Sequence, residues 1–185
     1  LPRFVGHIRR EAQRLVALIG DIIRLSQLDE GDPLPWEQVD IPALCRDIAA
    51  DLRDKAEKSQ VSLTVEGQDV QAEGVLLHET IYNLCDNAIG YNVPGGSVRV
   101  TVSDAGENAV ISVADTGIGI APEHQSRIFE RFYRVDKSHS KASGGTGLGL
   151  SIVKHAVAYH HGTVQLESQP GKGTTITVTI PRKQS

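Results

Sequence analysis

The chain has 185 residues, of which 39% are hydrophobic, 23% charged and 4% aromatic, and its formal net charge at pH 7 is -4. These proportions are typical of a folded globular protein with one domain and a short appendage, and they exclude a disordered chain. The acidic balance and the scarcity of aromatic residues argue against nucleic-acid binding, which usually needs a basic surface and stacking platforms.

The cysteine content and the first residue indicate the cellular compartment of the protein and the extent of the chain. Only Cys45 and Cys85 are present, which is too few for a disulfide framework, so a reducing, cytoplasmic compartment is expected. The chain contains no methionine and begins at Leu1, so it is expected to be a fragment of a longer protein. Any membrane attachment would then belong to segments outside this sequence.

Residues 1–31 form the first predicted unit, and their main element is one long helix. Leu18 and Leu25 widen its apolar stripe beyond a two-stranded seam, so the pattern predicts a four-helix bundle. A Gly-Asp-Pro sequence ends the helix, and residues 32–38 are predicted to be a linker. The heptad positions of the stripe are Val5, Ile8, Ala12, Leu15, Ile19 and Ile22.

Residues 39–185 are predicted to form a second domain of helices and strands. Asp40 is expected to cap a helix that has Pro42 in its first turn and continues to Ala56. This order is that of an α+β protein, most simply a mixed sheet layered against helices. The remaining pattern predicts helices over 77–88 and 148–161, and strands over 61–65, 98–102, 110–114, 163–168 and 174–181.

Two asparagines on the helix over 77–88 are candidate ligands. Asn83 and Asn87 are four residues apart, so their side chains project from the same face. An amide oxygen suits Mg²⁺, which binds few protein oxygens together with phosphates and waters. The alternative is that each amide caps or bridges neighbouring backbone, and the pair taken alone favours that alternative.

Asp115 directly follows an apolar strand and is itself followed by Gly117 and Gly119. A carboxylate at the end of a strand can accept a hydrogen bond from an exocyclic amine. The two glycines let the backbone approach a ligand closely. Taken alone, the same residues fit a glycine-rich turn equally well.

A glycine-rich run opens the helix over 148–161, and it contains Gly145, Thr146, Gly147, Leu148 and Gly149. Free amides at a helix N-terminus, together with the helix dipole, form an anion site. The segment before this run is rich in basic residues, which suits a lid over a triphosphate. These residues are Arg127, Arg131, Arg134, Lys137 and Lys141.

The asparagine pair, the Asp115 motif and the glycine-rich run follow one another along the chain in a distinctive order. In this order they closely resemble the sensor histidine kinases of two-component systems, within the ATPase superfamily that includes gyrase and Hsp90. Residues 83–88 are similar to the N box, 115–119 to the G1 box, 129–134 to the F box, 145–150 to the G2 box, and 171–174 to the later glycine turn. The resemblance covers essentially the whole chain. It implies a Bergerat-type two-layer α/β sandwich preceded by one long helix of a dimeric four-helix bundle.

The resemblance also implies a site for ATP and Mg²⁺. Asn87 would ligate Mg²⁺ and Asn83 would lie beside the phosphates. Asp115 would accept from the adenine amino group, and Tyr91 would pack on the adenine. Arg134 would reach the γ-phosphate with its guanidinium fork, so Asn83 and Arg134 are the expected catalytic residues.

Glycines 117, 119, 145, 147 and 149, with Thr146 and Leu148, would complete the nucleotide site by close backbone approach and by amide contacts to phosphates. The sequence departs from the family at Gly90, where a Lys or Arg often precedes the aromatic residue. One phosphate contact is therefore expected to be missing, or to be supplied from the lid by Lys137 or Lys141.

The implied function is phosphorylation of a histidine by ATP, followed by relay to an aspartate of a response regulator. Residues 1–31 resemble the second helix of the dimerisation and phosphotransfer hairpin. The acceptor histidine would therefore precede Leu1, and this fragment alone is not expected to autophosphorylate. Two alternatives remain open: an anti-sigma-factor-type serine kinase, and a degenerate nucleotide-binding or dimerisation module.

Four histidines that could suggest an acceptor or a metal site are not expected to carry chemistry. His7 lacks the acidic and Arg-Thr-Pro residues that follow the family's acceptor, so it is predicted to be a helix-surface residue. His155, His160 and His161 are not spaced for joint metal ligation on a helix, so they are predicted to be solvated.

Overall fold

The computed structural model describes residues 2–31, 33–135 and 145–183. Its elements, in chain order, are α1 (Pro2–Glu30), β1 (Glu37–Asp40), α2 (Ile41–Asp51), α3 (Arg53–Lys58), β2 (Ser62–Gly67), β3 (Gln71–Gly74), α4 (Leu77–Gly90), β4 (Ser97–Ala105), β5 (Asn108–Asp115), α5 (Pro122–Gln125), α7 (Gly149–Tyr159), β6 (Thr163–Gln169) and β7 (Gly173–Pro181). The predicted α+β class is confirmed by this order.

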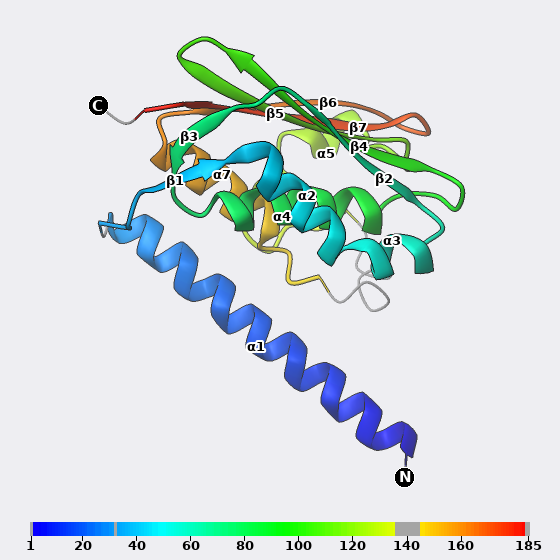
Figure 1. The fold of residues 1–185 in the computed structure, drawn as a ribbon. Coiled ribbons are helices and arrows are strands. Elements are labelled where there is room, and N and C mark those ends of the chain that lie inside the picture. Colours follow the sequence, from blue (N-terminus) through cyan, green and yellow to red (C-terminus); the bar gives the residue numbers. More distant parts are fainter. Residues whose placement is uncertain (1, 32, 136–144, 184–185) are drawn as a thin grey trace.

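A five-stranded sheet forms one layer of the domain, with the strand order β2-β4-β5-β7-β6. The β2–β4 pair is parallel and the other three pairs are antiparallel, so the sheet is mixed as predicted. Helices α2, α4 and α7 cover one face of the sheet, and α1 lies beyond them (Figure 1). The predicted two-layer sandwich is therefore the observed architecture.

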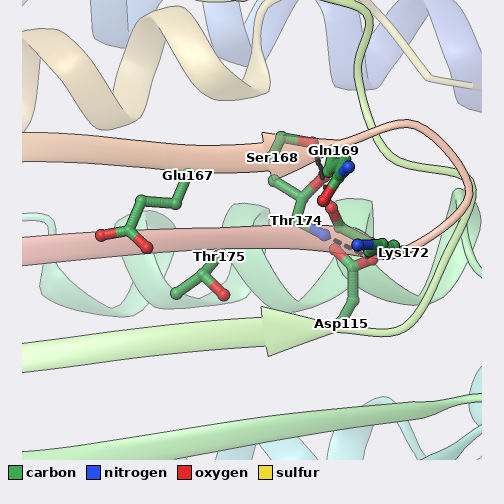
Figure 2. Close-up of a pocket in the computed structure, with 8 residues that line it drawn as sticks. Asp115, Glu167, Ser168, Gln169, Lys172, Thr174 and Thr175 are labelled. Atoms are coloured by element: carbon green, nitrogen blue, oxygen red, sulfur yellow. Dashed lines mark hydrogen bonds between the residues drawn. The ribbon is translucent and has the colours of Figure 1, made fainter.

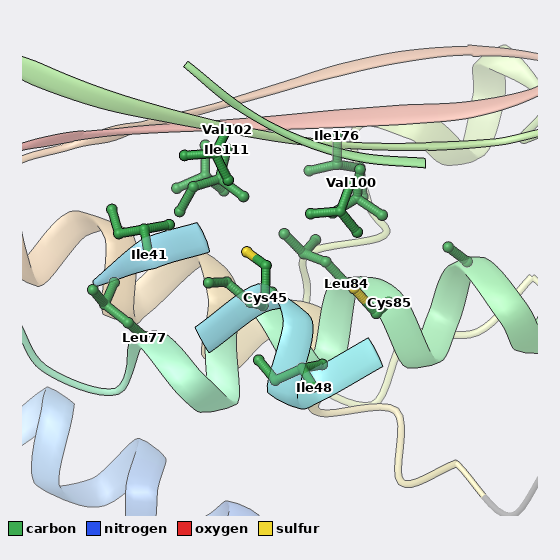
Figure 3. Close-up of a cluster of buried hydrophobic side chains, with 14 of the residues drawn as sticks. Ile41, Cys45, Ile48, Leu77, Leu84, Cys85, Val100, Val102, Ile111 and Ile176 are labelled. Atoms are coloured by element: carbon green, nitrogen blue, oxygen red, sulfur yellow. The ribbon is translucent and has the colours of Figure 1, made fainter. Parts of the chain in front are cut away.

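The main core lies between the sheet and the helices that cover it. Alternate residues of β4 and β5 are buried, because successive side chains of a strand point to opposite faces. Val100 and Ile111 from the sheet belong to the same buried cluster as Ile48 of α2 and Leu84 of α4 (Figure 3). This cluster holds α4 against the sheet and so positions the face that carries Asn83.

Two local differences from the predicted pattern follow from short-range geometry. The helix expected to run to Ala56 is divided at Leu52, whose φ and ψ are -87° and 0°, into α2 and α3. Strands β1 and β3 were not predicted, and they pair antiparallel with Val39 opposite Ala72. Each strand has four residues, which is too few for an alternation of apolar and polar residues to be recognised in the sequence.

Asp40 caps α2 as predicted, because its carboxylate accepts a hydrogen bond from the Ala43 amide at 2.9 Å. Strand β1 ends at this cap and begins at Glu37, within the stretch predicted as a linker. The segment that leads into the domain is therefore held in the β1–β3 pair before α2 begins.

The long N-terminal helix is confirmed as α1, and its C-terminal half lies against the domain. Leu25, only 3% exposed, packs with Leu148 and Ile152 in a second small core, and Leu18 packs against this cluster. Most of the heptad stripe has no cover: Val5, Ile8, Leu15, Ile19 and Ile22 are all exposed in the chain as described. By hydropathy, none of the helices in the described ranges could cross a bilayer.

Candidate functional site

The two asparagines of α4 lie on the predicted shared face and are half-buried. Neither side-chain amide makes a hydrogen bond to any residue that the structure describes, whereas their neighbour Thr80 bonds back to the Leu76 carbonyl at 2.8 Å. The alternative in which both asparagines cap or bridge backbone is therefore not what the fold uses. Half-buried amides without protein partners are suited to a ligand.

Helix α7 begins directly against this face. A Cβ built on Gly149 would stand 2.9 Å from Oδ1 of Asn83, a distance that real Cβ atoms essentially never show. Glycine at this position therefore allows the N-terminus of α7 to approach the amide. The predicted N-box and G2-box segments are brought together by this contact.

Asp115 stands at the end of β5, as predicted. Its Oδ1 accepts hydrogen bonds from the amide of Gly117 at 2.8 Å and from the amide of Thr174 at 3.2 Å. Burial raises the pKa of Asp115, and these two amide bonds oppose that rise. Oδ2 has no partner among the described residues, so one oxygen remains to accept a hydrogen bond from a ligand.

A pocket of about 330 Å³ opens beside Asp115 (Figure 2). Ser168 and Thr174 line it, and their hydroxyl oxygens are 2.8 Å apart. Ser168 also accepts a hydrogen bond from the Ile120 amide at 2.8 Å, so it ties the segment after Asp115 to β6. Ser168 was not among the predicted site residues, because a single serine in an alternating strand carries no signal of its own.

Gly117 and Gly119 are required by the packing of the chain on itself. A Cβ on Gly117 would lie 2.3 Å from the Tyr91 carbonyl oxygen, and a Cβ on Gly119 would lie 2.1 Å from that of Gln169. Gly119 also has a φ of +68°, which L side chains rarely adopt. The Ile118 amide donates to the Tyr91 carbonyl at 3.1 Å, so this turn is fixed beside the end of α4.

Tyr91 follows α4 and lies next to that turn with 42% of its surface exposed. An aromatic ring that is partly exposed has room to pack on a planar ligand. The Tyr91 backbone lies against the turn that follows Asp115, so the two residues expected to bind a purine belong to neighbouring segments.

The glycine-rich segment before α7 is held by its own threonine. Thr146 Oγ1 accepts a hydrogen bond from the Leu148 amide at 3.2 Å and donates one to Asp21 of α1 at 2.7 Å. The Leu148 side chain is buried, whereas the amides of Gly147 and Gly149 have no partner within the described ranges. These free amides at the start of α7 have the geometry expected of the predicted anion site.

Arg134 is the one predicted cation that lies against this segment in the described part of the chain. Its Nη1 donates to the Gly145 carbonyl, and a Cβ on Gly145 would be 3.5 Å from Nη2. The Nε atom of Arg134 is buried and has no hydrogen-bond partner. A buried guanidinium N–H without a partner, beside free backbone amides, fits an anion such as a phosphate.

Two other cations of the predicted lid are already paired. Arg127 bonds to Glu130 at 3.3 Å and lies over the Tyr133 ring, 4.3 Å from its centroid. Arg131 bonds to Asp29 of α1 at 2.6 Å, and this hydrogen bond lowers the pKa of Asp29. These two arginines of the predicted lid therefore already have carboxylate partners in the described structure. Lys137 and Lys141 lie outside the described residues.

The histidine predictions are partly wrong. His7 is exposed on α1 as predicted, but His160 is completely buried. Its Nδ1–H donates to the Ala156 carbonyl at 2.6 Å, and its Nε2 accepts from the Val75 amide at 3.0 Å. Both nitrogens are therefore occupied by structural bonds, and burial lowers the pKa of His160.

Within the ranges that the structure describes, no three His, Cys, Asp or Glu side chains are grouped as metal ligands. A protein site of carboxylates and imidazoles is therefore not present in that part of the chain. An ion that took the Asn87 amide oxygen would need its other ligands from substrate phosphates and water, which is the coordination Mg²⁺ favours. The donor set thus fits Mg²⁺ arriving with a nucleotide.

Comparison with known proteins agrees with this geometry. The family described as histidine kinase-, DNA gyrase B-, and HSP90-like ATPase matches residues 72–184. The sensor-like histidine kinase SenX3 of Mycolicibacterium smegmatis is 43% identical over 183 residues, covering 97% of this chain and 48% of that protein. The chain thus spans about half the length of this relative.

Solved structures show the same fold. Full-length ShkA in complex with AMPPNP matches with a TM-score of 0.84 and 27% identity, over 100% of this chain and 39% of that one. The mycobacterial sensor histidine kinase MprB matches with a TM-score of 0.69 and 29% identity, over 82% of this chain and 100% of that one. The first of these matches includes α1 as well as the sheet domain.

Proposed function

Because this chain belongs to the family of histidine kinase-, DNA gyrase B- and HSP90-like ATPases, we propose that it is the ATP-binding catalytic domain of a sensor histidine kinase. The observation that carries the proposal is the convergence of three separate segments on one region. These segments are the amide face of α4, the free oxygen of Asp115, and the free amides before α7.

Adenine recognition falls to Asp115 and Tyr91. The Asp115 Oδ1 atom is occupied by two backbone amides, so the carboxylate is held in one orientation with Oδ2 outward. That oxygen would accept from the adenine amino group while Tyr91 packs on the ring. Because a buried acceptor left unpaired costs free energy, this arrangement favours a base that bears a donor at this position.

Phosphate binding falls to the amides of Gly147 and Gly149, the Arg134 guanidinium and Asn83. Mg²⁺ would be held by the Asn87 amide oxygen and by phosphate oxygens, and there it would neutralise phosphate charge. Asn83 and Arg134 are the groups of this chain that would orient the γ-phosphate for transfer. They would contribute by positioning the phosphate and stabilising its charge, because the protein itself forms few covalent bonds in phosphoryl transfer.

In the reaction, the bond between the γ-phosphorus and the β,γ-bridging oxygen breaks, ADP leaves, and a bond forms from phosphorus to an imidazole nitrogen. The acceptor histidine, its homodimeric helical bundle and the response regulator belong to the proposal for the whole protein. The exposed heptad stripe of α1 supports a bundle, since a helix with such a stripe needs helical partners. A cytoplasmic location follows from the same proposal, because ATP is supplied there.

Two experiments test this function. Calorimetric titration of the purified chain with Mg-ATP and Mg-ADP should give saturable heat, and no heat would indicate a degenerate module. The chain extended by its parent's preceding helix should form an acid-labile phosphohistidine from ATP, whereas acid-stable phosphoserine on a supplied partner would favour the serine kinase. The serine kinase is the less favoured alternative, because relatives that match nearly the whole chain are named histidine kinases.

A further inference from the structure

Lys55 of α3 reaches across to the helix that carries the asparagines. Its Nζ bonds to the carboxylate of Asp86 and lies 3.4 Å from the Asp86 carbonyl oxygen. The two side chains are 35% and 34% exposed, so water reaches both partners of the pair. Ion pairs that water reaches contribute little to stability, so the ammonium can leave Asp86 at little cost.

The position of this ammonium relative to Gly90 is informative. A Cβ built on Gly90 would have the Lys55 Nζ at 3.9 Å as its nearest neighbour. Gly90 follows Asn83 by seven residues, about two helical turns, so it continues the face of α4 that bears both asparagines. The Lys55 ammonium therefore lies in van der Waals range of the point where a side chain at position 90 would begin, at the end of the amide face.

The lid cations that the structure describes already have partners, and one further lysine, Lys172, lines the pocket beside Asp115. Arg127 and Arg131 are paired with Glu130 and Asp29, and Arg134 is bonded to Gly145 at the opposite, α7 side of the asparagine face. A nucleoside triphosphate carries several negative charges, and its binding improves where cations approach from more than one side. Lys55 is the cation that approaches from the α3 side.

We propose that Lys55 binds a phosphate of the nucleotide, supplying from α3 the positive charge that Gly90 does not carry. This inference deepens the proposed function and rests on it. Lys55 exchanges its Asp86 partner for a phosphate oxygen, and Asp86 serves to hold the ammonium near the site when no nucleotide is bound. A purely structural ion pair between α3 and α4 is the competing explanation.

The test compares Mg-ATP with adenosine, which lacks phosphates. For Lys55→Ala, calorimetry should show about tenfold weaker Mg-ATP binding, as expected for one charged hydrogen bond. Adenosine affinity, measured by ligand-detected NMR titration, should not change. Lys58→Ala is the matched control, since Lys58 is an exposed lysine of the same short helix, and it should leave both affinities unchanged.

The double variant Lys55→Ala, Gly90→Lys should recover most of the lost Mg-ATP affinity, because position 90 is otherwise open to a side chain. Asp86→Asn separates the two explanations. Under the proposal it leaves Mg-ATP binding equal or tighter, because Lys55 is released. Equal loss of affinity and of Tm in Asp86→Asn and Lys55→Ala would overturn the proposal, as would Mg-ATP binding in Lys55→Ala equal to that of Lys58→Ala.

Failure of this inference can be told from failure of the proposed function. If the unmodified chain binds neither adenosine nor Mg-ATP, the nucleotide site itself is refuted and Lys55 with it. If both ligands bind to the unmodified chain and Lys55→Ala changes nothing, the nucleotide site stands and only the role of Lys55 is refuted.

Discussion

Oδ1 of Asn83 lies so close to Gly149 that a Cβ on the glycine would stand only 2.9 Å away. This contact joins the amide face of α4 to the first turn of α7, and it places the free amides around Gly149 beside the asparagines. The proposed nucleotide site therefore depends on the close approach of two helices that are distant in sequence.

The first prediction concerns that clearance. Gly149→Ala should displace the Asn83 amide and weaken Mg-ATP binding about tenfold, the size of one hydrogen bond to a charged group. The Tm should change little, because the displaced atom ends a flexible side chain and can move aside. Calorimetry and thermal unfolding measure the two effects.

Gly20→Ala in α1 is the matched control for helix propensity, since its Cβ would meet only the Arg24 guanidinium at 3.4 Å. It should raise the Tm without changing nucleotide affinity. If Gly149→Ala behaves like Gly20→Ala in both assays, the contact with Asn83 has no role in binding.

The second prediction concerns adenine. Asp115→Ala should abolish binding of adenosine and of Mg-ATP alike, by at least about a hundredfold, because the acceptor for the amino group is removed. Asp115→Asn should also lose binding, since an amide cannot present two acceptor oxygens. Undiminished adenosine binding in Asp115→Asn, measured by NMR titration, would contradict the assignment.

Asp115→Asn also tests the electrostatics of the site. Burial raises the pKa of Asp115 above its unfolded value, so its ionisation works against the fold as the pH rises through the folded pKa. Replacing the carboxylate with a neutral amide should therefore leave the Tm at pH 7 unchanged or higher. A marked drop in Tm would show that the two backbone hydrogen bonds outweigh desolvation.

The third prediction separates the metal from the nucleotide. Asn87→Ala should weaken ATP binding about tenfold in the presence of Mg²⁺ and much less in EDTA, because the amide oxygen would act on the metal. Calorimetry in both buffers measures the ratio. Equal losses with and without Mg²⁺ would assign Asn87 to the nucleotide rather than to the ion.

The fourth prediction concerns pH. Because burial lowers the pKa of His160 below its unfolded value near 6.5, the unfolded chain binds a proton that the folded chain excludes. Stability should therefore be complete above pH 6.5 and should decrease as the pH falls from 6.5 towards the folded pKa. The protonated ring would also lose the bond from the Val75 amide to Nε2.

His160→Gln should flatten the dependence of Tm on pH between 7 and 5.5, at some cost in Tm at pH 7. His7→Gln, which changes an exposed histidine of α1, should leave the slope unchanged. Equal slopes for all three proteins would show that His160 does not carry the pH dependence.

The sequence was sufficient to predict the long elements and to name candidate site residues. Helix α1, helix α4 and the paired strands β4 and β5 each carry enough apolar periodicity to predict their burial, so the α+β class followed directly. Asp115 and Asn83 were identifiable because each belongs to a short motif whose order along the chain is distinctive.

Side-chain partners were decided only by the tertiary structure. The pairing of Arg131 with Asp29, the burial of His160 and the approach of Lys55 to Gly90 all join residues far apart in sequence. Periodicity reports which face of an element is buried, but not which element covers it or which charges meet there. Those contacts depend on how α1, α3 and α7 pack around α4, where shifts of less than an ångström decide whether a bond forms.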